Sequence, residues 1–346
     1  MIPYGVAFFN LHKHARSPRF VSNQHDIANC MRSVIRDGFA NGSREEVIVE
    51  KLVNSVKKIN SFPIQLSSEF IHGHRSMVKY DFGGLEPQCE LGDMFIISVL
   101  TYNRKRIFQR ISFIQNKMAL KSRLTTKECS PKWKIDHTQL YLLKHFPPME
   151  GTSGLFKNCK IVLANTSRCL GSYGLLHAPD QMVFASAPLV SDLLFGNKII
   201  TSKQFSDITA RMNMYCCSSV HESTWPLFFS HIHPMDFMEL THMIHNFWRS
   251  HGYPWYPMPN SFVMNNHLSC DILDFVKNWT LLNIGEPTYF GETVVNPELD
   301  TIGNAMLRRV GMSDLFELPH DDNMNNNYNF ENGGFGIIAM VHDVTE

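Results

Sequence analysis

The sequence lacks several features that would place the protein in a common class. It has no run of about 18 consecutive apolar residues, so we expect no transmembrane helix and no membrane association. The first twenty residues carry a short apolar run without a basic region before it or a cleavage motif, so we expect no signal peptide. Lysine plus arginine and aspartate plus glutamate both number 32, so the net charge is zero. A nucleic-acid-binding surface would therefore have to be local.

Cysteine pairs of the kind that bind metals or form redox centres are also missing. None of the eight cysteines belongs to a CxxC pair, and only Cys216 and Cys217 lie close together. Adjacent cysteines rarely bridge, and no nearby base would make this pair a nucleophile. We therefore expect a reduced, cytoplasmic protein with buried thiols.

The length and composition suit one large domain or two smaller ones. The chain has 346 residues, of which 44% are hydrophobic, so material for a core is ample. The loop-forming stretch Pro147–Gly154 is the best candidate for a boundary. We predict one domain over residues 1–146 and a mixed α/β domain over 147–346, whose role would be recognition, partner binding or regulation. Its predicted strands are Leu155–Leu163, Gly171–His177 and Gly336–Val341, and its predicted helices include Pro234–Arg249, Ile272–Leu282 and Glu298–Val310.

The first half contains a clear amphipathic helix followed by strands. Ser43 and Glu46 form a capping-box pattern, and apolar residues then recur at helical spacing over Arg44–Ile59. Two extended segments, Ile64–Phe70 and Ser76–Tyr80, follow the helix. The pattern predicts that this helix packs one face against a core.

The next segment predicts a β-hairpin. Met94–Leu100 is apolar and rich in β-forming residues, the Asn103-Arg104-Lys105 stretch is polar and typical of a turn, and Ile107–Ile114 is again rich in β-forming residues. An acid, Asp93, stands at the start of the first strand. The second strand ends in a Gln-x-Lys pattern.

The three polar residues of this hairpin have the types that phosphodiester hydrolysis needs. Alternation along a strand puts Gln115 and Lys117 on one face, and a separation of 22 residues lets two strands and a turn bring them beside Asp93. Mg²⁺ prefers oxygen ligands and keeps several waters, so one or two carboxylates suffice to hold it. A lysine beside the metal can orient the attacking water or stabilise the transition state.

At these positions the sequence resembles the PD-(D/E)xK nuclease superfamily. More narrowly, the ELGD segment, the hairpin and its Gln-x-Lys ending are similar to a group of uncharacterised prokaryotic proteins associated with phage defence, as is the stretch from Gln139-Leu140-Tyr141 to Phe146-Pro147. The resemblance covers about a third of the chain. It implies a restriction-endonuclease-like mixed sheet flanked by helices, and Mg²⁺ or Mn²⁺ bound by Asp93 and Gln115.

The sequence departs from the superfamily pattern at one position. Gln115 stands where an acid is usual, and its neutral carbonyl oxygen is a weaker ligand. A further carboxylate is therefore expected to help, and Glu90 and Glu69 are the main candidates. Glu46 and Glu50 on the predicted helix are weaker candidates, while Arg75, with His72 and His74, is a candidate for lining the same cleft.

A local excess of positive charge adjoins the predicted site. The segment from Thr101 to Ile135 has one acid, Glu128, and ten basic residues, namely Arg104, Lys105, Arg106, Arg110, Lys117, Lys121, Arg123, Lys127, Lys132 and Lys134. We predict that phosphate groups are contacted by Arg104, Lys105, Arg106, Arg110, Lys121 and Arg123. The alternative is an exposed face balanced by acids elsewhere.

A second polar cluster lies between residues 221 and 251. It contains His221, His231, His233, His242, His245 and His251, together with Asp236 and Glu239. A zinc site is one interpretation. Because the HExxH motif is absent and the surrounding sequence is rich in aromatic residues, histidines packed among these aromatics are the favoured one.

Several functions stay open at this point. The first is a metal-dependent DNA nuclease of a prokaryotic defence system, with an ATPase or helicase as a candidate partner and dimerisation as one way to cut both strands. The others are a nuclease-like subunit of a larger complex that binds nucleic acid without cutting, a ribonuclease, and an interaction protein with a chance motif. In this last case Asp93 is a turn residue, and Gln115 and Lys117 lie at a solvated strand end.

Overall fold

The structure of the protein is a computed structural model that describes residues 3–56, 62–73, 75–120, 130–165, 170–194, 196–205, 269–317 and 334–345. Within these residues the largest sheet has nine strands and mixes parallel with antiparallel pairs. Its main path, in spatial order, is β1 (Ile64–Ile71), β15 (Phe335–Asp343), β4 (Met94–Tyr102), β5 (Lys105–Met118), β9 (Gly171–His177), β10 (Gln181–Ser186) and β12 (Ser269–Cys270). β13 (Glu286–Phe290) pairs with β5, and β14 (Thr293–Val294) pairs with β13.

The predicted hairpin is present and is longer than predicted. β4 and β5 pair in antiparallel register and are joined by Asn103 and Arg104, which both have positive φ angles of 52° and 61°. Positive φ at both central residues is the geometry of a type I′ turn, whose twist matches that of the flanking strands. The strands are buried on both faces, so burial along β5 does not alternate.

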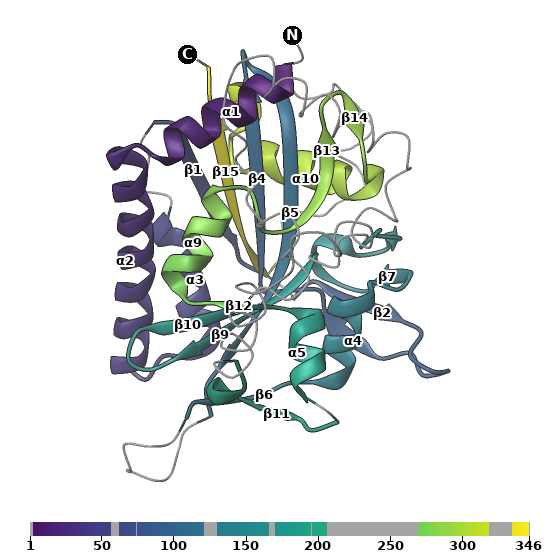
Figure 1. Cartoon of the computed structure of the whole chain (residues 1–346). Coiled ribbons are helices and arrows are strands. Elements are labelled where there is room, and N and C mark those ends of the chain that lie inside the picture. The colour runs from purple at the N-terminus through teal and green to yellow at the C-terminus, as the bar shows by residue number, and fades with distance from the viewer. Residues whose placement is uncertain are drawn as a thin grey trace, which may run out of the picture.

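Helices cover both faces of the sheet (Figure 1). One face packs against α1 (Pro3–Ala15), α2 (Pro18–Ala40), α3 (Glu45–Val56) and α9 (Ile272–Thr280). The opposite face packs against α4 (His137–His145), α5 (Ala187–Leu194) and α10 (Pro297–Arg309). The amphipathic helix predicted over Arg44–Ile59 is therefore confirmed as α3, within its described bounds.

Two smaller sheets flank the main one at the end where β4 begins and β5 ends (Figure 1). One has the order β3 (Gln88–Glu90), β2 (Met77–Tyr80), β7 (Met149–Gly151) and β8 (Lys160–Ile161). The other is a two-stranded ribbon of β6 (Lys132–Lys134) and β11 (Ile199–Thr201). Short 3₁₀ helices occur at Gly154–Phe156 and Ser313–Leu315, so the single strand predicted over Leu155–Leu163 is wrong.

The predicted division at residue 146 does not separate two units in the described residues. β15, from the end of the chain, lies between β1 and β4 and runs parallel to β4. β9 and β10 extend the same sheet beyond β5, and the proposed boundary stretch itself forms β7, which pairs with β2. The mixed α/β class is confirmed, but a separate C-terminal domain over 147–346 is not seen, because long-range strand pairing joins both halves. Among the described residues, no helix is both long and apolar enough to cross a membrane.

Candidate functional site

The hairpin register places Asp93 directly opposite Gln115. Met94 pairs with Ile114, so the residue before Met94 faces the residue after Ile114. The backbone of Asp93 is held from both neighbouring strands: its N–H donates to the Ile114 carbonyl at 3.0 Å, and its carbonyl accepts from the Gly336 N–H at 2.9 Å. This acid is therefore fixed inside the sheet, and not at a loose turn.

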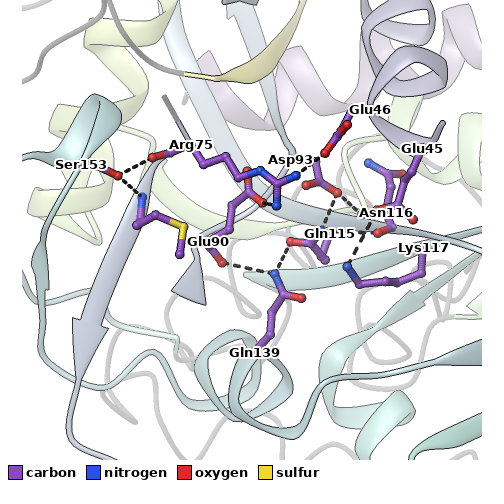
Figure 2. A network of polar contacts seen from close by, with 11 residues as sticks. Glu45, Glu46, Arg75, Glu90, Asp93, Gln115, Asn116, Lys117, Gln139 and Ser153 are labelled. Atoms are coloured by element: carbon purple, nitrogen blue, oxygen red, sulfur yellow. Dashed lines mark hydrogen bonds and ion pairs between the residues drawn. The ribbon is translucent and has the colours of Figure 1, made fainter. Parts of the chain in front are cut away.

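The side chain of Asp93 accepts two hydrogen bonds on one oxygen (Figure 2). Its Oδ2 accepts from Gln115 Nε2 at 2.6 Å and from the backbone N–H of Asn116 at 2.6 Å. Burial raises the pKa of Asp93 above its ordinary value, while Lys117 and the two hydrogen bonds oppose that rise. The hairpin thus brings together the acid and the amide that the sequence predicted.

Both the nitrogen and the oxygen of the Gln115 side-chain amide form hydrogen bonds. Its Nε2 faces Asp93, and its Oε1 accepts from Nε2 of Gln139, which lies on α4. The same Gln139 nitrogen donates to the backbone carbonyl of Glu90 at 3.3 Å. Gln139 therefore holds the Gln115 carbonyl oxygen away from Asp93. Sequence reasoning had marked Gln139 only as part of a resemblance and assigned it no role.

Glu90 contributes a second buried acid from the end of β3. Its side chain is 11% exposed and lies 3.7 Å from Arg75. Burial raises the pKa of Glu90 to about 8, with Asp93 adding to the rise and Arg75 and Lys117 opposing it. This carboxyl group is therefore protonated at a higher pH than an ordinary glutamate. Glu90, which the sequence offers as a further carboxylate to assist Gln115, thus lies near Asp93, and its role stays a prediction.

Lys117 meets an acid from α3. Its Nζ lies 3.8 Å from Oε1 of Glu45, whose other oxygen accepts from the Met118 N–H at 2.7 Å. Burial is the largest influence on Glu45 and raises its pKa, against the effect of Lys117. The sequence points to Glu46 and Glu50 on this helix but not to Glu45. The start of α3 and the end of β5 come into contact only in the folded structure.

Arg75 contacts two acids of the cluster (Figure 2). Its guanidinium contacts Glu46 as well as Glu90, and its backbone carbonyl accepts from Ser153 Oγ at 2.6 Å. Arg75, expected from the sequence to line a cleft with His72 and His74, thus lies beside acids of the cluster, and its role stays a prediction. Glu46 therefore forms an ion pair with Arg75. Oε1 of Glu50 lies 3.7 Å from Nε2 of His72.

Glu69 is not part of this cluster. β15 separates its strand from β4, and its carboxylate is engaged by Arg309 of α10 at 2.7 and 3.1 Å. The expectation that this segment lies alongside the hairpin is therefore wrong. Two strand spacings, roughly 10 Å, separate Glu69 from the β4 residue in line with it.

The predicted phosphate-contacting residues divide into three groups. Arg106 and Arg110 are 5% and 3% exposed and are engaged internally, Arg106 by Asp300 and Arg110 by the Gly285 carbonyl. Their predicted contact with phosphate is therefore wrong. Arg104 and Lys105 are exposed at the hairpin turn, at the opposite end of β5 from Lys117, roughly 40 Å away at the usual rise of a strand.

The third group, Lys121 and Arg123, lies outside the described part of the chain. The same is true of Lys127, His74, the histidine-rich segment 221–251 and the Cys216-Cys217 pair.

Tyr173 borders the site and was missed by sequence reasoning. It pairs in register with Gln115 on the neighbouring strand β9 and is fully buried. Its hydroxyl has no hydrogen-bond partner among the described residues, and burial, followed by Asp136, Cys89 and Asp93, raises its pKa well above the ordinary value. No local pattern around Tyr173 indicates this position, because parallel pairing of β5 with β9 creates it.

The chemistry of the donor set fits a hard divalent cation. The acids Asp93, Glu90 and Glu45 offer only oxygen, and burial is the largest cause of the raised pKa of each. Within the described ranges, no three His, Cys, Asp or Glu side chains are already gathered in the positions of a metal site. Gln115 would first have to turn its amide to present Oε1, because Gln139 now binds that oxygen.

Comparison with known proteins adds no assignment: no protein family, curated protein or solved structure matches this chain.

Proposed function

We propose that the protein is a metal-dependent nuclease that hydrolyses phosphodiester bonds of DNA. The observation that carries this proposal is the register of the hairpin, in which Asp93 lies opposite Gln115 and Lys117 follows two residues later on the same strand. A restriction-endonuclease-like core is part of the proposal. It is supported by α3, which precedes the hairpin and brings Glu45 to Lys117.

The proposed metal ligands are the carboxylates of Asp93 and Glu90, with the carbonyl oxygen of Gln115 after its amide turns. Mg²⁺ or Mn²⁺ bound there would supply a water of lowered pKa and neutralise charge that develops on the phosphate. Because the pKa of Glu90 is raised, a rise in pH deprotonates this carboxyl group and makes its carboxylate available to the cation. We therefore expect cation affinity to increase with pH.

Lys117 is the proposed group for orienting the attacking water and stabilising the transition state. Its side chain is 24% exposed, so a phosphate arriving from solvent can reach the ammonium group. Glu45 positions this ammonium at the end of β5, while its own second oxygen is held by the Met118 N–H. Arg75, whose side chain is 60% exposed and lies beside Glu90, is a further cation near the proposed metal ligands.

A subunit that binds nucleic acid without cutting it is the second candidate. The hydrogen bonds of the Gln115 amide favour this function. Its Nε2 donates to Asp93, and its Oε1 accepts from Gln139, so neither Asp93 nor the amide oxygen is free of a partner. An amide in this state satisfies the acid without a cation. The two candidates therefore differ in whether a divalent cation can displace that hydrogen bond.

The biological setting rests on the sequence resemblance. We place the protein in the cytoplasm of a prokaryote, in an anti-phage defence system, with an ATPase or helicase as a candidate partner and a homo-oligomer as a candidate assembly. DNA is favoured over RNA as the substrate on the same ground, and the metal chemistry would serve either one.

The test compares substrates, cations and matched variants. Purified protein is incubated with plasmid, linear duplex, single-stranded DNA or RNA, in Mg²⁺, Mn²⁺ or chelator. We expect metal-dependent cleavage that falls at least about a hundredfold in Asp93→Ala and in Lys117→Ala. Glu69→Gln is the control, since this acid is ion-paired with Arg309 away from the cluster.

Thermal unfolding of each variant checks that the fold is retained. Cleavage that survives Asp93→Ala would contradict the assigned site. Binding of nucleic acid without product in either metal would favour the second candidate.

A further inference from the structure

The ribbon of β6 and β11 exposes a cluster of lysines. In its antiparallel register Lys134 pairs with Ile199 and Lys132 pairs with Thr201. Lys132 and Lys134 are two residues apart, so they point to the same face, and both are exposed. Lys198 and Lys203, just before and after β11, are exposed as well. Two segments about seventy residues apart in the sequence therefore bring four exposed lysines to one two-stranded ribbon, which we call the lysine ribbon (Lys132, Lys134, Lys198 and Lys203).

The inner face of the ribbon anchors it to the main sheet. Trp133 is fully buried between the two exposed lysines, and its Nε1 donates to the Leu176 carbonyl at 3.0 Å. Its cross-strand partner Ile200 is fully buried too. Because inward and outward positions alternate along a strand, these anchors hold Lys132 and Lys134 toward solvent. Lys132 and Lys134 thus project from a strand whose central side chain is buried.

The charges of the lysine ribbon are uncompensated in the described part of the chain. None of its four lysines forms an ion pair or side-chain hydrogen bond with another described residue. The acid nearest in sequence, Asp136, caps α4 and accepts hydrogen bonds from the N–H groups of Thr138 and Gln139. Four positive charges in a protein of zero net charge form a local basic surface.

The lysine ribbon is connected directly to the strand that carries the candidate site. After β5 ends, the N–H of Leu120 donates to the Lys132 carbonyl at 2.7 Å, and the N–H of Ala119 donates to the Leu176 carbonyl at 2.8 Å. Leu120 is three residues beyond Lys117, roughly 10 Å in extended chain. A backbone lying on the ribbon could reach the Asp93 cluster within a few nucleotides.

We infer that the lysine ribbon is the surface on which the sugar-phosphate backbone of a nucleic acid docks as it approaches Asp93 and Lys117. The inference rests on the proposed function for the choice of ligand, since an acidic protein would also be attracted to four lysines. Nucleic acid is favoured because Lys117, Arg75 and the carboxylates beside the ribbon suit a phosphodiester. Lysines at the ribbon supply affinity without reading sequence.

The test measures binding separately from cleavage. Fluorescent duplex DNA, single-stranded DNA and single-stranded RNA are titrated with the full chain in chelator, over a series of salt concentrations. The variants are the double substitutions Lys132→Gln/Lys134→Gln and Lys198→Gln/Lys203→Gln. The control is Lys157→Gln/Lys160→Gln, which removes two exposed lysines beside the outermost strand of the other small sheet. Poly-glutamate as a competitor distinguishes a general anion surface.

We expect each ribbon variant to bind more weakly, and the slope of log affinity against log salt for duplex DNA to decrease by about one for each lysine that contacts a phosphate. The control should keep the slope of the unmodified protein. Unchanged slopes in both ribbon variants, absence of binding by the unmodified protein, or equal competition by poly-glutamate at matched charge would overturn the inference.

The outcomes separate the inference from the proposed function. Weaker binding by the ribbon variants, with no cleavage by the unmodified protein in any metal, would keep the docking surface and reject the nuclease. Metal-dependent cleavage with unchanged binding by the ribbon variants would keep the nuclease and reject the docking surface.

Discussion

The two ends of β5 carry polar clusters that differ in burial and in their balance of charge. Near the hairpin turn, Arg106 meets Asp300 through two contacts of 2.8 and 3.1 Å, and Gln109 and Thr288 also donate to that carboxylate. One cation there faces one acid, and the acid is surrounded by donors. This is how a structural ion pair is stabilised in an interior.

At the far end of the strand the acids outnumber the cations. Glu45, Glu46, Glu90 and Asp93 face only Arg75 and Lys117 in their described contacts. Burial raises the pKa of three of these acids, and Tyr173 beside them keeps its hydroxyl without a partner among the described residues. Such incomplete compensation is typical of a site that awaits a ligand. The comparison shows that the two clusters differ in their balance of acids and cations, and the proposed function predicts that this difference marks the site.

The largest expected effect is on stability at the structural end. Asp300→Ala leaves Arg106 buried without its acid, and we expect a loss of about 3–5 kcal/mol in the free energy of unfolding. Denaturant titration followed by circular dichroism measures the loss. Asp93→Ala is the matched change at the other end, where removal of a crowded charge should cost far less. Equal losses in both variants would remove the distinction between the two clusters.

The second prediction concerns pH. The pKa of Glu90 is about 8 in the folded protein and 4.5 ordinarily, so the folded state binds an extra proton between those values. The contribution of Glu90 to stability without divalent cations is therefore greatest below about pH 5 and falls as pH rises toward 8, by an amount on the order of 2–3 kcal/mol. Unfolding measured across this range tests the slope.

Glu90→Gln keeps the shape of the side chain and removes its titration. Its stability should vary less with pH over the same interval. If the slope persists in this variant, another group must bind the proton.

The smallest effect expected concerns the Gln115 amide. Gln115→Glu replaces a neutral oxygen donor by a carboxylate and removes the Nε2–H bond to Asp93. We expect Mn²⁺ affinity, measured by calorimetry on the protein without substrate, to rise about tenfold, in keeping with the importance of ligand charge at such sites. Affinity that stays unchanged would argue against Gln115 as a ligand position.

Gln139→Leu provides a graded control for this change. It removes the donor to the Gln115 carbonyl oxygen and leaves every acid in place. The gain in Mn²⁺ affinity should therefore be smaller than for Gln115→Glu but in the same direction. No change would indicate that Gln139 does not limit the turning of the amide.

The sequence by itself determined the local part of the site. A turn of Asn103 and Arg104 between two β-rich runs defines the hairpin, and the hairpin register then places Asp93 beside Gln115. These relations span few residues, and they follow from the period-two geometry of strands and from turn chemistry.

Only the tertiary structure decided which distant residues complete the site and which charges face solvent. Glu45 and Gln139 reach the hairpin from α3 and α4, and Arg106 is buried by Asp300, which lies 194 residues away. β15 enters between β1 and β4 and moves Glu69 away from the site. The physical reason is that strand pairing and ion pairing depend on proximity in space, which local periodicity does not encode. The basic residues of the segment from Thr101 to Ile135 are therefore divided among the hairpin turn, the interior ion pair of Arg106 and the lysine ribbon.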